Sequence, residues 1–125
     1  MQDRYRLRKG SDFRRVYSAR RRHDGALLTL YVRPNQLAHA RVGFAVSTKV
    51  GGAVVRNAVK RRLREACRAW VEALPGDGVD LVVVATPEAA WAGFGALTED
   101  LVKLLSAVRP APPKDAGRVP GGIQL

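Results

Sequence analysis

Several residue types that support particular functions are scarce in this chain of 125 residues. It has one cysteine, which excludes an intramolecular disulfide and favours, weakly, a reducing compartment such as the cytoplasm. No apolar run approaches the roughly 18 residues that predict a membrane-spanning helix. The charged start MQDRYRLRKG has no apolar core, so we expect no secretory signal. The basic stretches of the chain lack the Trp/Phe/Leu-rich face of a membrane-lying helix, so we also expect no membrane partner.

Side chains that could carry out catalysis are scarce as well. The two histidines, His23 and His39, are expected in a hairpin and a loop, and turn chemistry explains Asp77 and Asp80. Cys67 is expected to be a small buried residue rather than a nucleophile. Because no Cys, His or acidic residues have the spacing of a metal site, the sequence predicts neither catalytic residues nor a protein metal site.

Acidic residues are few relative to basic ones: 11 Asp and Glu stand against 22 Lys and Arg, a net charge of +11. Residues 1–22 hold nine basic and two acidic residues, and residues 49–68 hold seven basic and one acidic. Arginine greatly outnumbers lysine, and its planar guanidinium pairs with phosphate and stacks on bases. The two basic blocks therefore predict a polyanionic partner, with nucleic acid the first candidate.

Hydrophobic periodicity predicts one α+β domain over residues 1–108, followed by a Pro/Gly-rich, disordered tail at 109–125. Residues 1–10 are expected to be an extended arm, and Asp24-Gly25 a hairpin turn. The expected elements are a short helix after residue 11, strands at 19–23, 26–33 and 41–47, a helix at 53–74, a strand at 79–85 and a helix at 96–108. This order predicts a two-layer sandwich of about four strands with helices on one face and a parallel crossover over 41–85.

The two strands at 26–33 and 41–47 alternate in side-chain size. One face carries large apolar residues, and the other carries Thr29, Tyr31, Gly43, Ala45 and Ser47. We expect this second face to form a shallow open surface. Tyr31 stands there among small or polar neighbours, where an aromatic ring can stack on any base.

The stretch AVVRNAVKRRLREACR, at residues 53–68, combines a packing stripe with a charged one. On a helical wheel, Val55, Val59 and Leu63 share one arc. A separate arc carries Arg56, Asn57, Lys60, Arg61, Arg64 and Arg68. A solvated helix face is the ordinary explanation, but like charges four residues apart repel by roughly 0.2–0.5 kcal/mol per pair. The repetition of one sign favours an anion-binding face.

The stretch RVGFAVSTKVGGAVVRNAVKRRLRE, at residues 41–65, resembles the protein subunit of bacterial ribonuclease P. The family pattern is R-x-G-[FL]-x-V-S-x-K, followed by G-x-A-V-x-R-N-x-x-K-R-x-x-R-[EQ]. The resemblance extends from DFRRVY to about residue 108. One departure is Ala58, which stands where the family often has the last residue of an Arg-Asn-Arg triplet.

The resemblance implies a noncatalytic protein that assists a catalytic RNA in cleaving the 5′ leader from precursor tRNA, with no DNA partner. Mg²⁺ would be held mainly by the RNA subunit and the substrate. The family also implies a left-handed β-α-β crossover. The residues that would contact the RNA subunit are Lys49, Arg56, Asn57, Lys60, Arg61, Arg64 and Arg68. Those that would contact the leader are Phe13, Arg14, Tyr17 and Tyr31, although Phe13 and Tyr17 are equally explained as core of a short helix.

Two other classes of function remain open from the sequence. A basic RNA-binding module of the ribosome or of its assembly would share the charge blocks but would need no cleft for a leader. A nuclease acting without an RNA subunit would cleave RNA as the protein alone.

Overall fold

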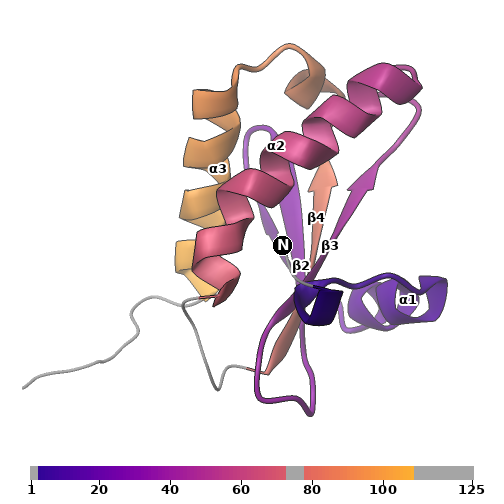
Figure 1. Ribbon diagram of the computed structural model, residues 1–125, viewed down its shortest axis with the longest axis vertical. Helices are drawn as coiled ribbons and strands as arrows, with labels where there is room; N and C mark the ends of the chain where they lie inside the picture. The colour runs from indigo at the N-terminus through magenta and orange to yellow at the C-terminus, as the bar shows by residue number, and fades with distance from the viewer. Residues whose placement is uncertain (1–2, 73–77, 109–125) are drawn as a thin grey trace, which may run out of the picture.

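The computed structural model describes residues 3–72 and 78–108, which form three α-helices and a four-stranded sheet (Figure 1). The elements are η1 (Asp3–Tyr5), α1 (Gly10–Ser18), β1 (Arg21–Asp24), β2 (Leu28–Pro34), β3 (Arg41–Val46), α2 (Ala53–Glu72), β4 (Val79–Ala85), η2 (Pro87–Ala90) and α3 (Phe94–Val108). The predicted α+β fold and its order of helices and strands are confirmed. The proposed tail at 109–125 lies outside the described residues and stays a prediction.

The strands are ordered β1-β2-β4-β3. β2 pairs antiparallel with β1 and with β4, whereas β3 pairs parallel with β4. In Figure 1, α2 lies in front of the sheet and the arrowhead of β4 lies to the left of that of β3, so the β3-α2-β4 crossover is left-handed. This is the hand that the family implies, and it opposes the right-handed rule that about 98% of such units obey.

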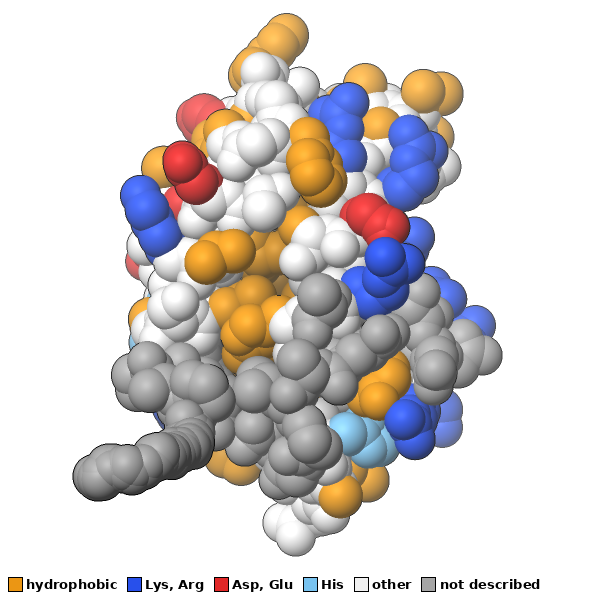
Figure 2. Space-filling view, turned by 60° about the vertical axis from the view of Figure 1, so that its left-hand side comes forward, with side chains coloured by type: hydrophobic (Ala, Val, Ile, Leu, Met, Phe, Trp, Pro, Cys, Tyr) orange, Lys and Arg blue, Asp and Glu red, His pale blue; other side chains and the backbone are white. Residues whose placement is uncertain are grey.

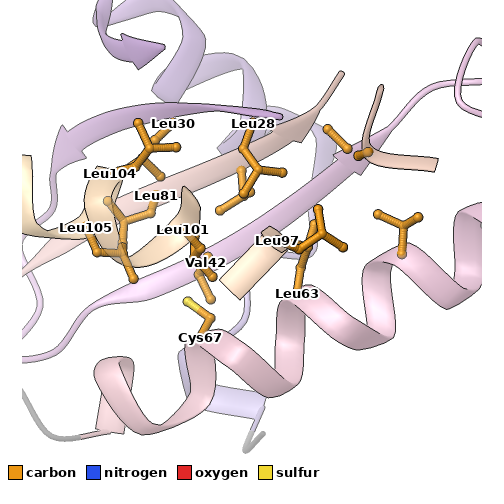
Figure 3. Close-up of a cluster of buried hydrophobic side chains, with 14 of the residues drawn as sticks. Leu28, Leu30, Val42, Leu63, Cys67, Leu81, Leu97, Leu101, Leu104 and Leu105 are labelled. Atoms are coloured by element: carbon orange, nitrogen blue, oxygen red, sulfur yellow. The ribbon is translucent and has the colours of Figure 1, made fainter. Parts of the chain in front are cut away.

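One face of the sheet, which we call the core face, packs on α2 and α3. The alternation predicted for β2 holds, because Leu28, Leu30 and Val32 all point to this face and are at most 1% exposed. Figure 3 shows their neighbours from the other strands and from both helices pointing toward one another: Val42, Leu63, Cys67, Leu81, Leu97, Leu101, Leu104 and Leu105. This aliphatic layer is the main source of stability through burial.

The opposite face, which we call the α1 face, is only partly covered. Val16 of α1 is fully buried against it and forms a small second cluster with Leu7 and Val82. The prediction placed the helices on one face. The structure places α2 and α3 there and α1 on the other face, because the apolar side of α1 requires its own surface to bury.

The N-terminal segment is docked rather than being the extended arm expected from its lack of periodicity. Tyr5 and Leu7 are 8% and 5% exposed. The Leu7 N–H donates to the Val42 carbonyl at 2.9 Å, and Arg6 forms a parallel bridge with Val42. Two buried apolar side chains, alternating with basic ones, therefore attach this segment along the outer edge of β3.

Asp100 of α3 ties the β1–β2 hairpin to the helical layer. Its carboxylate accepts hydrogen bonds from the backbone N–H groups of Ala26, Leu27 and Leu28 at 3.0–3.1 Å. A Cβ built on Gly25 would overlap this carboxylate, so a larger residue there would have to displace Asp100 from these hydrogen bonds. The predicted hairpin is confirmed, with Asp24 as the last residue of β1 and Gly25 in the loop before β2, and the contact with a distant helix favours glycine there.

Candidate RNA-binding site

α2 carries the two stripes that the helical wheel separates. Val59, Leu63 and Cys67 recur every four residues and are at most 1% exposed on the core face. Val55, which the wheel placed with them, is 40% exposed, because α2 begins beyond the end of β3 and its first turn overhangs the core. The packing stripe therefore begins at Val59.

The basic residues of α2 lie away from this stripe. Asn57, Arg61 and Arg68 are exposed, as is Lys49 just before the helix, whereas Arg56, Lys60 and Arg64 are partly buried. The structure thus brings the seven predicted RNA-subunit residues to one helix and the segment leading into it. We call this set the basic face. In Figure 2, Lys and Arg side chains gather on the flank over α2 and are sparse over α3.

Few acids offset this charge. The first turn of α2 has no acidic residue, although the positive end of the helix dipole would favour one there. Arg68 pairs with Glu65 at 3.2 Å, and both side chains are about half exposed (51% each), so water screens this pair. The basic face therefore has the excess of positive charge that is typical of an anion-binding surface.

The α1 face is arranged in rows across the sheet. The strand register aligns Tyr31 with Val82 and Gly43, and aligns Thr29 with Val84 and Ala45. Phe13 of α1 lies over Gly43, where any Cβ would overlap its ring. Glycine at this position therefore lets α1 approach the sheet.

The next row along remains accessible. Thr29, Val84 and Ala45 are each partly buried, whereas Val82 is fully buried under α1. We call these three residues the open row. It forms a shallow floor bordered by α1. The open surface predicted from the alternation of residue size therefore holds at Thr29 and Ala45, but the prediction was wrong for Gly43, which is buried under Phe13.

Tyr17 of α1 and Tyr31 of β2 meet at the border of this floor. Their ring centroids are 4.9 Å apart and their planes are at 85°, an edge-to-face pair. Tyr17 is 36% exposed. Partial burial and the neighbouring Tyr31 raise the pKa of Tyr17 above its ordinary value. The pair is an aromatic surface that is partly exposed to solvent.

Arg22 of β1 lies directly opposite Tyr31 and was not singled out by the sequence. Its guanidinium donates to the Tyr31 hydroxyl at 3.5 Å and to Asp24 at 3.2 Å. The bond to Tyr31, followed by the charge and hydrogen bond of Asp24, raises the pKa of Arg22. Only the pairing of β1 with β2 identifies this residue, because in the sequence it is one of a run of three arginines.

The other two predicted leader residues are placed differently from the tyrosine pair. Phe13 is partly buried between α1 and β3, so the alternative of core packing accounts for much of its surface. Arg14 is exposed and borders a separate hollow with Arg15 and Arg33. The structure thus brings together Tyr17 and Tyr31, with Phe13 on the same helix and Arg14 to one side.

Arg41, the first residue of the family-like stretch, has a structural partner. It donates from Nε and Nη2 to the Asp80 carboxylate at 2.9 and 2.7 Å, and Asn35 donates to the same carboxylate at 2.7 Å. These bonds to Asp80 are the main reason that the pKa of Arg41 is raised. Turn chemistry was the wrong explanation for Asp80, which is 3% exposed and pairs with the neighbouring strand; Asp77 lies outside the described residues.

The carboxylates beside the α1 face do not fit a protein cage for Mg²⁺. Asp12 pairs with Arg15 at 3.0 Å, Asp24 accepts from Arg22 and Thr29, and Asp80 is held by Arg41. Within residues 3–72 and 78–108, no three His, Cys, Asp or Glu residues are grouped as metal ligands. Cys67 is fully buried as predicted, and burial raises the pKa of its thiol to about 12.

Comparison with known proteins decides the family. The sequence model of the Ribonuclease P family matches residues 1–109. The chain belongs to the ribonuclease P protein family. The ribonuclease P protein component of Nocardioides sp. is 45% identical over 107 residues, covering 83% of this chain and 91% of the relative. That of Chloroflexus aurantiacus is 42% identical over 111 residues, covering 86% and 82%.

Solved ribonuclease P proteins have the same fold. The Staphylococcus aureus protein superposes with a TM-score of 0.76 at 28% identity, covering 84% of this chain and 95% of that one. The Thermotoga maritima protein gives 0.73 at 28% identity, covering 82% and 96%. The predicted family is therefore confirmed, and with it a role in tRNA processing. Among the described helices, none is both long and apolar enough to span a membrane.

Proposed function

We propose that this ribonuclease P protein binds the catalytic RNA of the enzyme through its basic face and holds the 5′ leader of precursor tRNA on the open row. The RNA subunit would carry out the cleavage, in the cytoplasm. The observation that carries the proposal is the pairing of two surfaces in one small domain. One is the basic face, with six basic or amide side chains on α2 and Lys49 just before it, and the other is a shallow floor bordered by Tyr17 and Tyr31.

The chemistry of each surface supports its partner. Arginine and lysine bind phosphates without regard to sequence, which suits the backbone of a folded RNA. Single-stranded RNA exposes its bases, and aromatic rings stack on them at a value of about 1–3 kcal/mol per base. The shallow open row offers room for such a strand. The carboxylates near it are engaged by arginine or threonine, so we propose that Mg²⁺ is held by the RNAs.

Reconstitution with the RNA subunit tests the proposal. Precursor tRNA cleavage at low Mg²⁺ should be faster with the protein than with RNA alone. Absence of any stimulation would overturn the proposal, and cleavage by the protein alone would instead support an independent nuclease.

Tyr31→Ala separates leader binding from general RNA binding. We expect it to weaken binding of precursor tRNA by about 5- to 100-fold, the equivalent of one lost stacked base, and to leave mature tRNA unaffected. Trp91→Ala is the matched control, because Trp91 is an aromatic side chain that is 88% exposed and lies beyond η2. Equal losses for precursor and mature tRNA would favour the alternative of a general ribosomal RNA-binding module.

Arg64→Ala tests the basic face. It should weaken binding to the RNA subunit and lower the slope of log K against log salt by about 0.7–0.9, the equivalent of one phosphate contact. Arg62→Ala removes the same charge from the same helix outside the basic face and serves as control. An unchanged slope for Arg64→Ala would remove that residue from the interface.

A further inference from the structure

The outer side of α3 is not covered by any other described element of the fold. Figure 1 shows α3 at the edge of the molecule, with α2 and the sheet on its inner side only. That inner side is closely packed, and its leucines are at most 5% exposed: Leu97, Leu101, Leu104 and Leu105. The outer side carries a shallow hollow of about 550 Å³, which we call the outer hollow and which is lined by Phe94, Gly95, Thr98, Glu99, Val102 and Lys103.

The outer hollow leaves apolar surface in contact with water. Phe94 and Val102 are 47% and 52% exposed. The Thr98 hydroxyl donates to the Phe94 carbonyl at 2.9 Å, so its proton already has an acceptor within the helix. A Cβ built on Gly95 would meet no other part of the fold within 4 Å, so there is open space beside this backbone. A second helix could therefore approach closely without burying an unpaired donor of Thr98.

The charge of this side distinguishes it from the two proposed RNA-binding surfaces. In residues 78–108, Lys103 is the only basic residue and four residues are acidic, although the whole chain has a net charge of +11. Figure 2, which turns the α3 side toward the viewer, shows few Lys and Arg side chains there. Nucleic acid is therefore a poor occupant, whereas two copies of this basic chain would repel each other least when they meet at this side.

Glu99 and Lys103 border the hollow with opposite charges one helical turn apart. Within residues 3–72 and 78–108, neither side chain forms an ion pair. The helical wheel places both on the same flank of the outer side. When two identical helices pack antiparallel about a twofold axis, the same flanks face each other, and each contact occurs twice. An axis at the level of residues 101 and 102 therefore brings each Glu99 to the Lys103 of the other copy.

The same axis suits the small and apolar side chains of the outer side. Val102 lies beside the axis, where it would pack against its own counterpart. Gly95 and the exposed Ser106 lie on either side of the axis and would face each other in the two copies. Small residues facing small residues let two helices approach closely. Charge and side-chain size are therefore both complementary in a single register.

We propose that a second copy of this chain docks on the outer hollow, through antiparallel pairing of two α3 helices about a twofold axis beside Val102. The basic face and the open row lie outside the pairing surface, so the proposal does not depend on the proposed function. A single helix of 15 residues offers less area than a standard interface, so we expect a weak dimer with a Kd on the order of 100 µM. The chain would be monomeric at the low micromolar concentrations of unfolding experiments.

Sedimentation equilibrium of the full chain without RNA tests the dimer. Between about 5 µM and about 1 mM, the apparent mass should rise from 13.6 kDa toward twice that value. Val102→Asp would bring two carboxylates together beside the axis and should weaken association at least about tenfold. Val54→Asp is the matched control, because Val54 is 84% exposed on α2, and it should associate like the native chain.

Exchange of the two charges tests the register. Glu99→Lys alone, or Lys103→Glu alone, sets like charges opposite each other and should weaken the dimer by about 3- to 10-fold. The double variant E99K/K103E sets opposite charges face to face again, and its affinity should return to within about twofold of that of the native chain. Equal thermal unfolding midpoints in dilute solution would establish that all the variants fold.

Three results would overturn the proposal. The first is a native chain that stays at 13.6 kDa throughout, which would leave the outer hollow to a different protein or to residues 109–125. The second is association that Val102→Asp leaves unchanged. The third is a loss in the single charge variants that the double variant does not repair. No measurement involves RNA, so failure of the dimer is distinct from failure of the proposed function.

Discussion

The two faces of the sheet differ in what covers them and in what holds the cover in place. The core face buries Leu and Val side chains from three strands under two long helices. The α1 face has a smaller cluster, which Leu7 and Val82 form with Val16 of the nine-residue α1. Under the proposed function, a small domain that binds RNA along its sheet has to leave part of that sheet uncovered. The apolar packing that stabilises the fold is therefore concentrated on the core face, and part of the α1 face stays accessible.

Polar contacts compensate for the smaller apolar area on the α1 face. Arg41 forms two hydrogen bonds with Asp80 and lies 4.0 Å from Asp12 of α1, which connects the sheet to the helix above it. Charged hydrogen bonds hold a defined geometry over a short distance, whereas apolar packing needs area. The contrast between the faces leads to four measurements, ordered by the size of the expected effect.

Truncation on the core face should give the largest loss of stability. Leu63→Ala removes a fully buried side chain of α2 and should lower the free energy of unfolding by about 3 kcal/mol through lost burial and a cavity. Urea denaturation measures this loss. Val102→Ala on α3, where the side chain is 52% exposed, should cost less than about 0.5 kcal/mol. Similar losses for the two variants would contradict the assignment of the core face.

Loss of the ion pair tests what holds the α1 face. Asp80→Asn keeps the shape of the side chain and leaves Arg41 with the carboxylate of Asp12, at 4.0 Å, as its charged partner. Because the Arg41 side chain is 24% exposed and retains some hydration, we expect a loss of about 2–3 kcal/mol rather than the full cost of a buried charge. Urea denaturation measures this loss of unfolding free energy. A loss below about 0.5 kcal/mol would show that apolar packing alone positions the strands there.

Alkaline pH probes the core face through Cys67. Burial raises the pKa of its thiol from 9.0 to about 12, so the folded protein holds this proton more tightly than the unfolded chain. The contribution of the protonated thiol to the free energy of unfolding is therefore complete below pH 9 and is lost as pH rises toward 12. Between pH 8 and 10, the free energy of unfolding of the native chain should fall by about 1 kcal/mol more than that of Cys67→Ala. Parallel pH profiles of the two proteins would contradict the burial of the thiol.

Arg22→Ala should leave stability almost unchanged and still affect binding. Arg22 is exposed and its contacts to Tyr31 and Asp24 are screened by water, so the thermal unfolding midpoint should not move measurably. Affinity for the leader should fall several-fold, because a cation beside the tyrosine pair is removed. Arg21→Ala, on the other side of the same strand, is the control, and equal leader affinities for both variants would remove Arg22 from the site.

Local sequence patterns predicted the parts of this fold that depend on neighbouring residues. Alternation in β2 assigned Leu28 and Leu30 to the core face and Tyr31 to the α1 face, and the helical wheel separated Leu63 from Lys60. These predictions succeed because strand and helix periods are properties of the backbone. The assignment of RNA ligands to these surfaces stays a prediction.

Features that join distant segments were not predicted. Arg41 and Asp80 are 39 residues apart in the sequence. Asp100 is 72 to 74 residues away from the backbone N–H groups that donate hydrogen bonds to it. The N-terminal segment was expected to be extended because its apolar residues, Tyr5 and Leu7, are too few to show a period. Only the position of the β3 edge explains why these two side chains are buried.

The placement of Asp100 has a consequence for where we expect RNA not to bind. Three converging backbone N–H groups are a common cradle for phosphate, and in the β1–β2 hairpin they are filled by the protein's own carboxylate. Asp80 occupies the guanidinium of Arg41 in the same way. Under the proposed function, these carboxylates would compete with nucleic acid for the positive groups of a chain with a net charge of +11. They would restrict RNA to the surfaces where no acidic side chain takes the place of a phosphate.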